Sequence, residues 1–520
     1  MSINGFPFLL FLFAAVVVYY LVPTHRRWLV LLAASAGFYL TFGLRPALYF
    51  LVTIAATFAF SLGLARLAQQ RPEGETREAR QAAKQRIKKR KNSLLALALL
   101  FNFGTLFLLK YSASWVAGID RIFRADLPVP SFLLPLGISF YVFQTSAYLI
   151  DVSKGKVKPE RNPLRYMLFA GYFPQLIQGP INSYQELAPQ LVRGNAFDWE
   201  NVQYGVLRML YGILKKALIA DVLAPAVEAV YSGFYDYPGA IAFFGAALYC
   251  LQLYCDFSGG IDLVCGASSL FGVRMRENFR QPYFSTSLAD FWRRWHISLG
   301  EWMKDYLFYP LALSKSFQRF SKWARKHLPA ELAKRATPCV VTFIVFLAVG
   351  VWQGPGLANL AYGMWNGFWM SLGLLWVPTA ARLRERHSLL RRQGLMTVFG
   401  ILRTNLLVII GRYFSRAASL MGALRMLKHT FVRPGFSAVS AQTFASLGLT
   451  KGLVLQVVLA SAVLFGVSLA QERGVRVDRW LCTRKWYVQF AVLFFALLLV
   501  VFCVYANTDY VPIAYVYENV

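Results

Sequence analysis

Residues 6–22 read FPFLLFLFAAVVVYYLV and residues 486–505 read WYVQFAVLFFALLLVVFCVY, so the chain contains two long apolar stretches. Neither stretch contains a charged residue. A helix rises about 1.5 Å per residue, and about 20 apolar residues therefore cross a hydrocarbon core of roughly 30 Å. The two stretches predict membrane-spanning helices, and they decide the fold class.

The composition of the 520 residues agrees with this prediction. Apolar residues make up 57% of the chain and charged residues 15%, and the mean hydropathy is +0.45. A typical soluble domain has about 45–50% apolar and about 25% charged residues. This difference excludes a soluble enzyme, a disordered chain and a secreted disulfide scaffold. The six cysteines form no Cys-x-x-Cys pair and no histidine-flanked spacing, so we expect buried apolar cysteines and no metal site.

The formal net charge of +30 needs an explanation, because a basic chain often binds nucleic acid. Here the Lys and Arg residues gather between apolar stretches, where the positive-inside rule places cytoplasmic loops. We therefore expect contact with membrane lipid and no nucleic-acid partner. The densest run predicts a basic cytoplasmic loop over residues 66–92, within a single polytopic domain over residues 1–520.

The first loops predict the orientation. Residues 1–5 carry no positive charge, whereas His25, Arg26 and Arg27 flank the far end of the first apolar stretch. We therefore expect no cleavable signal, an N-terminus outside the cell, and alternating spans at 28–44, 47–67, 94–111 and 132–150. An outer loop of mixed charge separates the last two spans (Asp120, Arg121, Arg124 and Asp126).

The later part of the chain is less regular. Residues 166–181 are apolar but contain Pro174, Pro180, Gln175 and Gln178, which favours a re-entrant element over a plain span. Further spans are expected at 206–231, 240–271 (in two pieces), 339–351, 358–376, 395–410, 453–470 and 486–505. The sequence predicts an all-α integral membrane protein with about 11 to 13 transmembrane or re-entrant helices and interfacial amphipathic helices.

One of the five histidines, His296, lies apart from the basic loops. It belongs to residues 287–306, SLADFWRRWHISLGEWMKDY, where Ser287 and Asp290 resemble a capping box and Pro310 bounds the far end. A single helix with about 100° per residue places the aromatic residues and His296 on one arc and most charged residues on the other. His296 is then either a packed histidine that bonds a neighbour or a reacting group.

Two carboxylates lie in the apolar stretch before this helix. Asp256 and Asp262 belong to LQLYCDFSGGID (residues 251–262), and an ionised carboxylate there needs a cationic partner or a water-filled cavity. One interpretation is an ion pair with Arg274, Arg276 or Arg293 that joins two elements. The other is a polar funnel that leads to a reacting group.

A third unusual stretch is GVWQGPG at residues 350–356, followed by WNG at residues 365–367. Gly and Pro at the end of an apolar stretch indicate a break in a helix. Gln353, Asn359 and Asn366 are neutral polar residues at membrane depth. They either form hydrogen bonds between helices or make the wall of an active site.

Several motifs together resemble the membrane-bound O-acyltransferase family, in particular its bacterial branch, which acetylates alginate and other envelope polysaccharides or passes D-alanine to teichoic acid. The most specific is FWRRWHISL at residues 291–299. The others are FPQLIQGPI at 173–181, DFSG at 256–259, NF at 278–279, DY at 305–306 and PL at 310–311.

The resemblance implies a ring of helices around a central polar funnel, in which a histidine acts as general base on an acceptor hydroxyl. The donor approaches from the cytoplasm and the acceptor from outside. His296 matches one active-site histidine of the family. The other belongs to a Gly-x-Trp-His-Gly pattern that here reads Gly-Val-Trp-Gln-Gly, so Gln353 occupies its position. Glutamine cannot serve as a base, but it can orient an acyl carbonyl or stabilise an oxyanion.

The resemblance further implies an acyl thioester donor (acyl-CoA or an acyl-carrier protein), no bound cofactor, a glycopolymer acceptor and an extracytoplasmic transferase as partner, in a bacterial plasma membrane. We expect six residues to contact substrate: Asp256, Trp292, Arg293, Trp295, Trp352 and Asn366. Gln353 leaves an alternative open, in which an impaired family member serves as a membrane scaffold or acyl conduit for a partner transferase.

Overall fold

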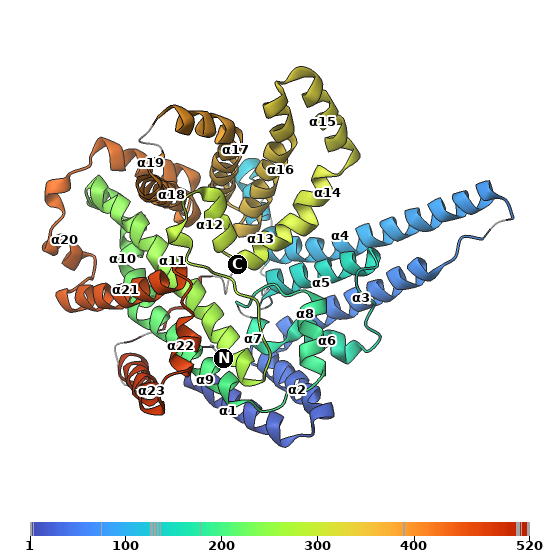
Figure 1. Ribbon diagram of the computed structural model, residues 1–520, viewed down its shortest axis with the longest axis horizontal. Helices are drawn as coiled ribbons and strands as arrows, with labels where there is room; N and C mark the ends of the chain where they lie inside the picture. Colours follow the sequence, from blue (N-terminus) through green and yellow to red (C-terminus); the bar gives the residue numbers. More distant parts are fainter. Residues whose placement is uncertain are drawn as a thin grey trace. The chain divides into compact units, whose positions relative to one another are not determined.

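The structure is a computed structural model that describes residues 3, 5–73, 75–124, 128, 130, 132, 135, 137–176, 178–387, 391–505, 510 and 512–516 (Figure 1). These residues fold into helices, and the only β-pairing among them is an isolated antiparallel bridge between Phe279 and Trp295. The prediction of an all-α integral membrane protein is confirmed. Asp126 of the expected mixed-charge loop lies outside the described residues.

Seven of the described helices are long and apolar enough to cross a membrane, and α1 (Phe6–Leu21) is a shorter apolar helix. Their outward faces carry large exposed apolar side chains, as lipid contact requires. The last of them is the extreme case, because only 6% of its apolar window is buried within the protein. The seven are α3 (Leu44–Gln69), α4 (Arg77–Phe123), α11 (Gly239–Leu270), α16 (Ala330–Gln353), α18 (Gln393–Arg416), α21 (Lys451–Glu472) and α23 (Trp486–Val500).

The chain divides into two compact units, and the expectation of one domain over residues 1–520 stays a prediction. The first unit comprises residues 1–209, 261–276 and 514–520, and the second comprises residues 210–260 and 277–513. Besides α1, α3 and α4, the first unit contains α2 (Arg27–Leu40), α5 (Ile138–Ser153), α6 (Pro163–Gly171), α7 (Phe173–Leu176), α8 (Tyr184–Val192) and most of α9 (Trp199–Lys215).

The expected loop over residues 66–92 is in large part helical, so that expectation was wrong in its local structure. Helix α4 begins at Arg77, where the Thr76 hydroxyl accepts a hydrogen bond from the Ala79 amide at 3.1 Å. It then continues through the basic run into the apolar span, alongside α3 (Figure 1). Lys, Arg, Glu, Gln and Ala are all good helix formers, so solvent exposure of this run does not require a loop.

Residues 166–181 do not form a plain span, as expected. Helices α6 and α7 are nine and four residues long, too short to cross a membrane. The buried Gln175 amide donates to the Phe169 carbonyl at 3.0 Å and to Gln144 Oε1 at 3.2 Å. Protein groups therefore satisfy the Gln175 side chain, whereas the buried Gln178 amide has no hydrogen-bond partner among the described residues.

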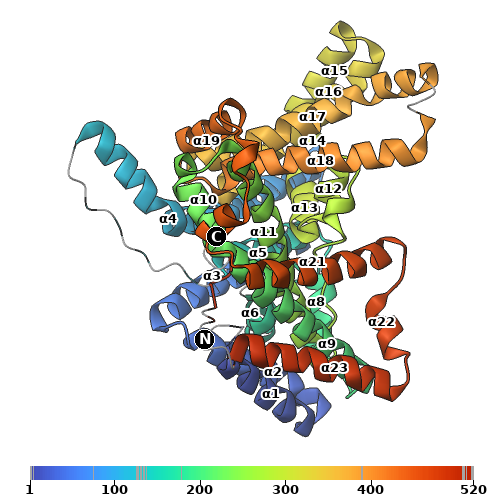
Figure 2. The ribbon, with the colours of Figure 1, turned by 90° about the vertical axis from the view of Figure 1, so that its left-hand side faces the viewer.

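The second unit carries most of the motifs singled out in the sequence, whereas residues 173–181 and Asp262 belong to the first. A π-helical turn (Lys216–Ala220) joins α9 to α10 (Asp221–Ser232). The remaining helices are α12 (Leu288–Arg294), α13 (Ile297–Met303), α14 (Tyr309–Ala312), α15 (Lys315–His327), α17 (Leu357–Arg386), α19 (Leu420–Val432), α20 (Ala441–Ser446) and α22 (Val477–Cys482). Figure 2 shows helices α21 and α23 connected through the short helix α22.

Helix α11 is a single helix of 32 residues, so the expectation of two pieces was wrong. The Gly259-Gly260 pair does not break the helix, and no proline lies next to it. A Cβ at Gly259 would lie 2.7 Å from the Gly212 carbonyl oxygen. The glycine therefore permits the close approach of α9 to α11 instead of ending the helix.

Helices α16 and α17 form a close hairpin (Figure 2). A Cβ at Gly350 would lie 2.6 Å from the Asn359 carbonyl oxygen, and one at Gly363 would lie 2.4 Å from the Phe346 carbonyl oxygen. Small residues thus allow the two backbones to pack directly, as in other membrane helix pairs. This packing fixes the end of α16, where Trp352 and Gln353 lie.

Candidate active site

The expected continuous helix over residues 287–306 is broken at His296, so that prediction was wrong. The Ser287 cap is confirmed, because its hydroxyl accepts from the Asp290 amide at 3.1 Å. Helix α12 then ends at Arg294, and α13 starts at Ile297. His296 between them has φ 49° and ψ 54°, in the left-handed region.

Backbone pairing explains the break. The Arg280 amide donates to the Arg294 carbonyl at 2.9 Å, and the Ile297 amide donates to the Asn278 carbonyl at 3.0 Å. These two bonds flank the bridge between Phe279 and Trp295 and hold the chain in a turn. A left-handed conformation costs a residue other than glycine roughly 1–2 kcal/mol, so the surrounding contacts impose it.

The hydrogen bonds of Asn278 determine which nitrogen of His296 carries a proton. Asn278 Oδ1 lies 3.0 Å from the Ser298 backbone nitrogen, 2.9 Å from Ser298 Oγ and 3.3 Å from His296 Nδ1. A backbone amide can only donate, which identifies this Asn278 atom as the oxygen. Since an amide oxygen only accepts, Nδ1 of His296 is the protonated nitrogen. Nε2 of the neutral ring therefore keeps the basic lone pair.

His296 is enclosed by aromatic rings and lies outside the candidate membrane spans. Its side chain is only 2% exposed, and its ring centroid lies 4.9 Å from that of Phe257 and 6.1 Å from that of Trp352. Burial lowers the pKa of His296 to about 3, so the ring is neutral at physiological pH. It can accept a proton where a nearby negative charge offsets the buried cation.

The structure brings the His296 turn and the C-terminal end of α16 together. Trp352, whose ring faces His296, is buried, and Gln353 follows it as the last residue of α16. Gly354 continues in extended backbone, and a Cβ there would lie 2.4 Å from Asn359 Nδ2. The two segments that carry the expected catalytic positions, His296 and Gln353, thus adjoin through the Trp352 ring.

Asn366 and Trp292 are bound to each other. Trp292 Nε1 donates to Asn366 Oδ1 at 3.2 Å, and Asn366 Nδ2 donates to the Tyr362 carbonyl at 2.9 Å. The amide oxygen thus joins α12 to α17, while the amide nitrogen bonds within α17. This arrangement matches the interpretation of Asn366 as an interhelical hydrogen-bonding residue, and it fixes the orientation of α12.

The expected partners of the two carboxylates were wrong. Asp256 Oδ1 lies 2.6 Å from Lys216 Nζ, which also lies 2.7 Å from Asp221 Oδ1. All three side chains are at most 4% exposed. Asp221 also accepts a hydrogen bond from the Tyr510 hydroxyl at 2.6 Å. Asp256 thus belongs to a buried ion cluster that joins α10, the π-helical turn and α11.

The arginines considered as partners lie elsewhere. Arg276 pairs with Glu186, and the Arg293 side chain is 74% exposed and lies 3.5 Å from Asp290. Asp262 is bound instead by Arg208 at 3.0 Å. Arg293 is therefore not brought to the buried His296 turn. Trp295 does belong to this turn, and its ring stacks on that of Phe291 with the two ring centroids 5.5 Å apart.

Sequence reasoning missed Arg412 of α18. Its side chain is 3% exposed, its Cζ lies 5.1 Å from the Trp295 ring centroid, and Nη1 donates to the Tyr362 hydroxyl at 3.3 Å. Among the described residues, its Nε and Nη2 have no hydrogen-bond partner. A desolvated cation–π contact is worth roughly 2 kcal/mol, less than the several kcal/mol that burial of a charge costs. The signal in the sequence was an arginine just past the expected span at 395–410.

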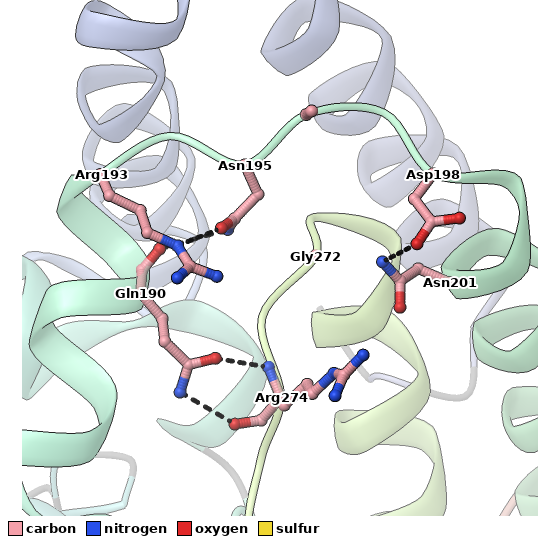
Figure 3. Close-up of a pocket in the computed structure, with 8 residues that line it drawn as sticks. Gln190, Arg193, Asn195, Asp198, Asn201, Gly272 and Arg274 are labelled. Carbon is pink, nitrogen blue, oxygen red and sulfur yellow. Dashed lines mark hydrogen bonds between the residues drawn. The ribbon is translucent and has the colours of Figure 1, made fainter.

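A separate cavity of about 450 Å³ lies in the first unit, between the end of α8, the start of α9 and residues 272–274 (Figure 3). Its polar side chains bind backbone groups and one another. Gln190 accepts from the Arg274 amide at 2.9 Å, and Arg193 Nε donates to Asn195 Oδ1 at 2.7 Å. None of the expected site residues lines this cavity. Among the described residues, no cluster of His, Cys, Asp and Glu is suited to a metal ion.

Comparisons with known proteins identify the family. Residues 152–409 match the model of the MBOAT, membrane-bound O-acyltransferase family. The chain is 32% identical over 436 residues to a probable alginate O-acetylase of Azotobacter vinelandii, which covers 83% of this chain and 77% of the relative. It is 28% identical to the peptidoglycan O-acetyltransferase of Helicobacter pylori, over 64% of each chain. It is 26% identical to the teichoic acid D-alanyltransferase of Bacillus subtilis, over 45% of this chain and 58% of that one. The chain therefore belongs to the membrane-bound O-acyltransferase family and is a membrane acyltransferase.

Proposed function

We propose that this chain moves an acyl group of acetyl or D-alanyl type from a thioester donor to hydroxyls of an exported cell-envelope polysaccharide or teichoic acid. His296 is the general base in this proposal. The observation that carries it is the bond from His296 Nδ1 to Asn278, which leaves the lone pair of Nε2 as the basic site. A base of this kind contributes about 10²–10⁴-fold to a reaction rate.

In the proposed step, Nε2 takes the proton of the acceptor hydroxyl while the hydroxyl oxygen attacks the acyl carbonyl carbon. The new C–O bond forms, and the carbonyl π electrons move to oxygen. Collapse of this tetrahedral oxyanion breaks the C–S bond and expels the thiolate. The imidazolium then protonates the thiolate, which restores neutral His296 and releases the donor as a free thiol.

Asn278 supports this cycle because its Oδ1 accepts from Nδ1–H in both the neutral and the protonated ring. The strong burial of His296 keeps the resting ring neutral, so Nε2 carries no proton before the acceptor hydroxyl approaches. The imidazolium forms together with the oxyanion, so the two opposite charges compensate each other in the same enclosed space.

Gln353 has the second role in the proposal. Its neutral amide can donate a hydrogen bond to the acyl carbonyl oxygen, and that bond strengthens as the oxyanion develops. Its support is its place directly after Trp352, the ring that faces His296. A neutral donor at this position leaves His296 as the one proposed base.

The names of the relatives support the polymer class, because they refer to alginate, peptidoglycan and teichoic acid. We further propose a bacterial plasma membrane with the N-terminus outside, an acyl-CoA or acyl-carrier donor on the basic cytoplasmic side, and an extracytoplasmic transferase as partner. Purified protein, a labelled acyl thioester and an anionic polysaccharide test this directly. Label that appears in the polymer supports the proposal, and polymer that stays unlabelled with every thioester contradicts it.

Gln353 favours one alternative, an impaired family member that serves as a scaffold or acyl conduit for a partner transferase. The variant Gln353→His separates the two. On the main proposal glutamine belongs to the working site, so the transfer rate of Gln353→His falls. A large rise in rate would indicate a lapsed site and support the scaffold.

A further inference from the structure

Arg412 is a buried cation for which the described residues provide no carboxylate. It lies near the end of α18, three residues beyond the segment that matches the family model. Its Nη1 donates to the neutral Tyr362 hydroxyl, while Nε and Nη2 have no hydrogen-bond partner among the described residues. An arginine remains charged at all physiological pH values, so it cannot avoid this burial by losing its proton.

The groups that face Arg412 are aromatic or weakly acidic. Its Cζ lies 5.1 Å from the centroid of Trp295 and 5.9 Å from that of Tyr362. The guanidinium also interacts electrostatically with the Cys250 thiol and with the hydroxyls of three tyrosines, Tyr231, Tyr249 and Tyr283. Each of these acids is neutral when protonated and gives the guanidinium no full negative charge. The ion pairs found for other buried cations, such as Lys216, have no counterpart here among the described residues.

The position of this cation connects it with the candidate active site. Trp295, whose ring faces Arg412, directly precedes His296 in the turn. Nε and Nη2 lie on one edge of the planar guanidinium, and that edge binds carboxylates and phosphates through two parallel hydrogen bonds. An intramembrane ionisable residue at such a place indicates a substrate path.

We propose that Arg412 is an oxyanion-binding residue that anchors a carboxylate or phosphate of a substrate beside the His296 turn. The anion neutralises the guanidinium and accepts hydrogen bonds from Nε and Nη2. The inference rests on the proposed function in that the ligand is one of the two substrates. An anionic acceptor carries the group on its polymer backbone, and a thioester donor carries it as the phosphate of its carrier arm.

Two pairs of probes test the proposal by binding alone, with calorimetry on purified full-length protein in detergent. A uronic acid disaccharide and its neutral glucose counterpart represent the acceptor. Pantetheine 4′-phosphate and pantetheine represent the donor. In the wild-type chain, the charged member of one pair is expected to bind roughly 10–100-fold tighter than its neutral partner, as for a charge-assisted anchor. The pair that shows the preference identifies the source of the anion.

Arg412→Met is expected to bring the two affinities of that pair within about 2-fold of each other, and Arg412→Lys to retain part of the preference. Arg403→Met is the matched control on α18, since Arg403 is exposed and donates to the Thr286 carbonyl. It should keep the full preference. If Arg412→Met does not fold, a Lys variant with the full wild-type preference would count against the anchor.

Absence of any preference in the wild-type chain, or its persistence in Arg412→Met, would overturn the proposal. Neither measurement requires turnover. A failure of acyl transfer therefore leaves the binding result readable, and the two proposals fail separately.

Discussion

His296 Nδ1 lies 3.3 Å from Asn278 Oδ1, the same oxygen that accepts from the backbone amide of Ser298. This arrangement leaves one tautomer of His296 in the folded protein. It makes Asn278, which is fully buried, a positioning residue for the proposed base. The role resembles that of other groups that orient a histidine through its second nitrogen.

Asn278→Ala is expected to lower kcat by about 10–100-fold, because the ring loses the bond that fixes its tautomer. KM should change little if Asn278 does not touch substrate. Asn278→Asp should shift the kcat–pH profile to higher pH, since a carboxylate stabilises the imidazolium. Ser298→Ala is the control and should keep the wild-type pH profile. An unchanged kcat in Asn278→Ala would show that the tautomer does not matter.

The buried His296 makes stability depend on pH. Its pKa is about 3 in the folded chain and about 6.5 when unfolded, so the unfolded state binds one more proton between these values. The contribution of His296 to the free energy of unfolding is therefore fully present above pH 6.5. Below that value it falls by about 1.4 kcal/mol per pH unit. When the pH falls from 6.5 to 5, the free energy of unfolding of His296→Gln should drop by about 2 kcal/mol less than that of the wild-type protein. Chemical denaturation in detergent measures this difference, and parallel curves for the two proteins would refute it.

The close packing of α16 on α17 depends on Gly350. Gly350→Ala places a Cβ 2.6 Å from the Asn359 carbonyl oxygen, a backbone atom that cannot rotate away. We expect the helices to separate, with a loss of roughly 1–3 kcal/mol and a displaced Trp352–Gln353 end. Gly373→Ala on α17 is the matched control, since among the described residues no side chain or other helix lies within 4 Å of its Cβ position. Equal melting temperatures for the two variants would contradict this account.

The buried cluster of Lys216, Asp221 and Asp256 should respond asymmetrically to substitution. Lys216→Met leaves two buried carboxylates without their cation and is expected to cost about 3–5 kcal/mol. Lys156→Met removes an exposed partner of Asp151, with the lysine 60% exposed, and should cost at most about 1 kcal/mol. Thermal unfolding of both variants gives the comparison. A similar small cost in each would show that the cluster contributes little.

Much of the fold follows from local sequence. The apolar stretches predict the membrane helices, Ser287 predicts a helix start, and the prolines around Gln175 predict a broken segment. These features depend on hydrophobic length, on a capping side chain and on proline, which act within a few residues. The family motifs likewise predicted that the segments carrying His296 and Gln353 belong to one site, and the structure places these segments side by side.

The remaining features depend on contacts between distant residues. The turn at His296 arises from pairing with residues 278–280, which overrides the helical propensity of the segment. Lys216 reaches Asp256 through a π-helical turn that no local pattern indicates. Sequence reasoning missed Arg412, because its burial against Trp295 follows only from the packing of α18. Sequence periodicity contains no information on such partners.

His296 is the proposed general base of acyl transfer. The most direct test measures labelled acyl transfer to an anionic polysaccharide by purified wild type, His296→Ala and the control His387→Ala, whose histidine is exposed. We expect a loss of at least about 10²-fold in His296→Ala, partial rescue by added imidazole, and wild-type activity in His387→Ala. Equal transfer by His296→Ala and the wild-type protein would contradict it.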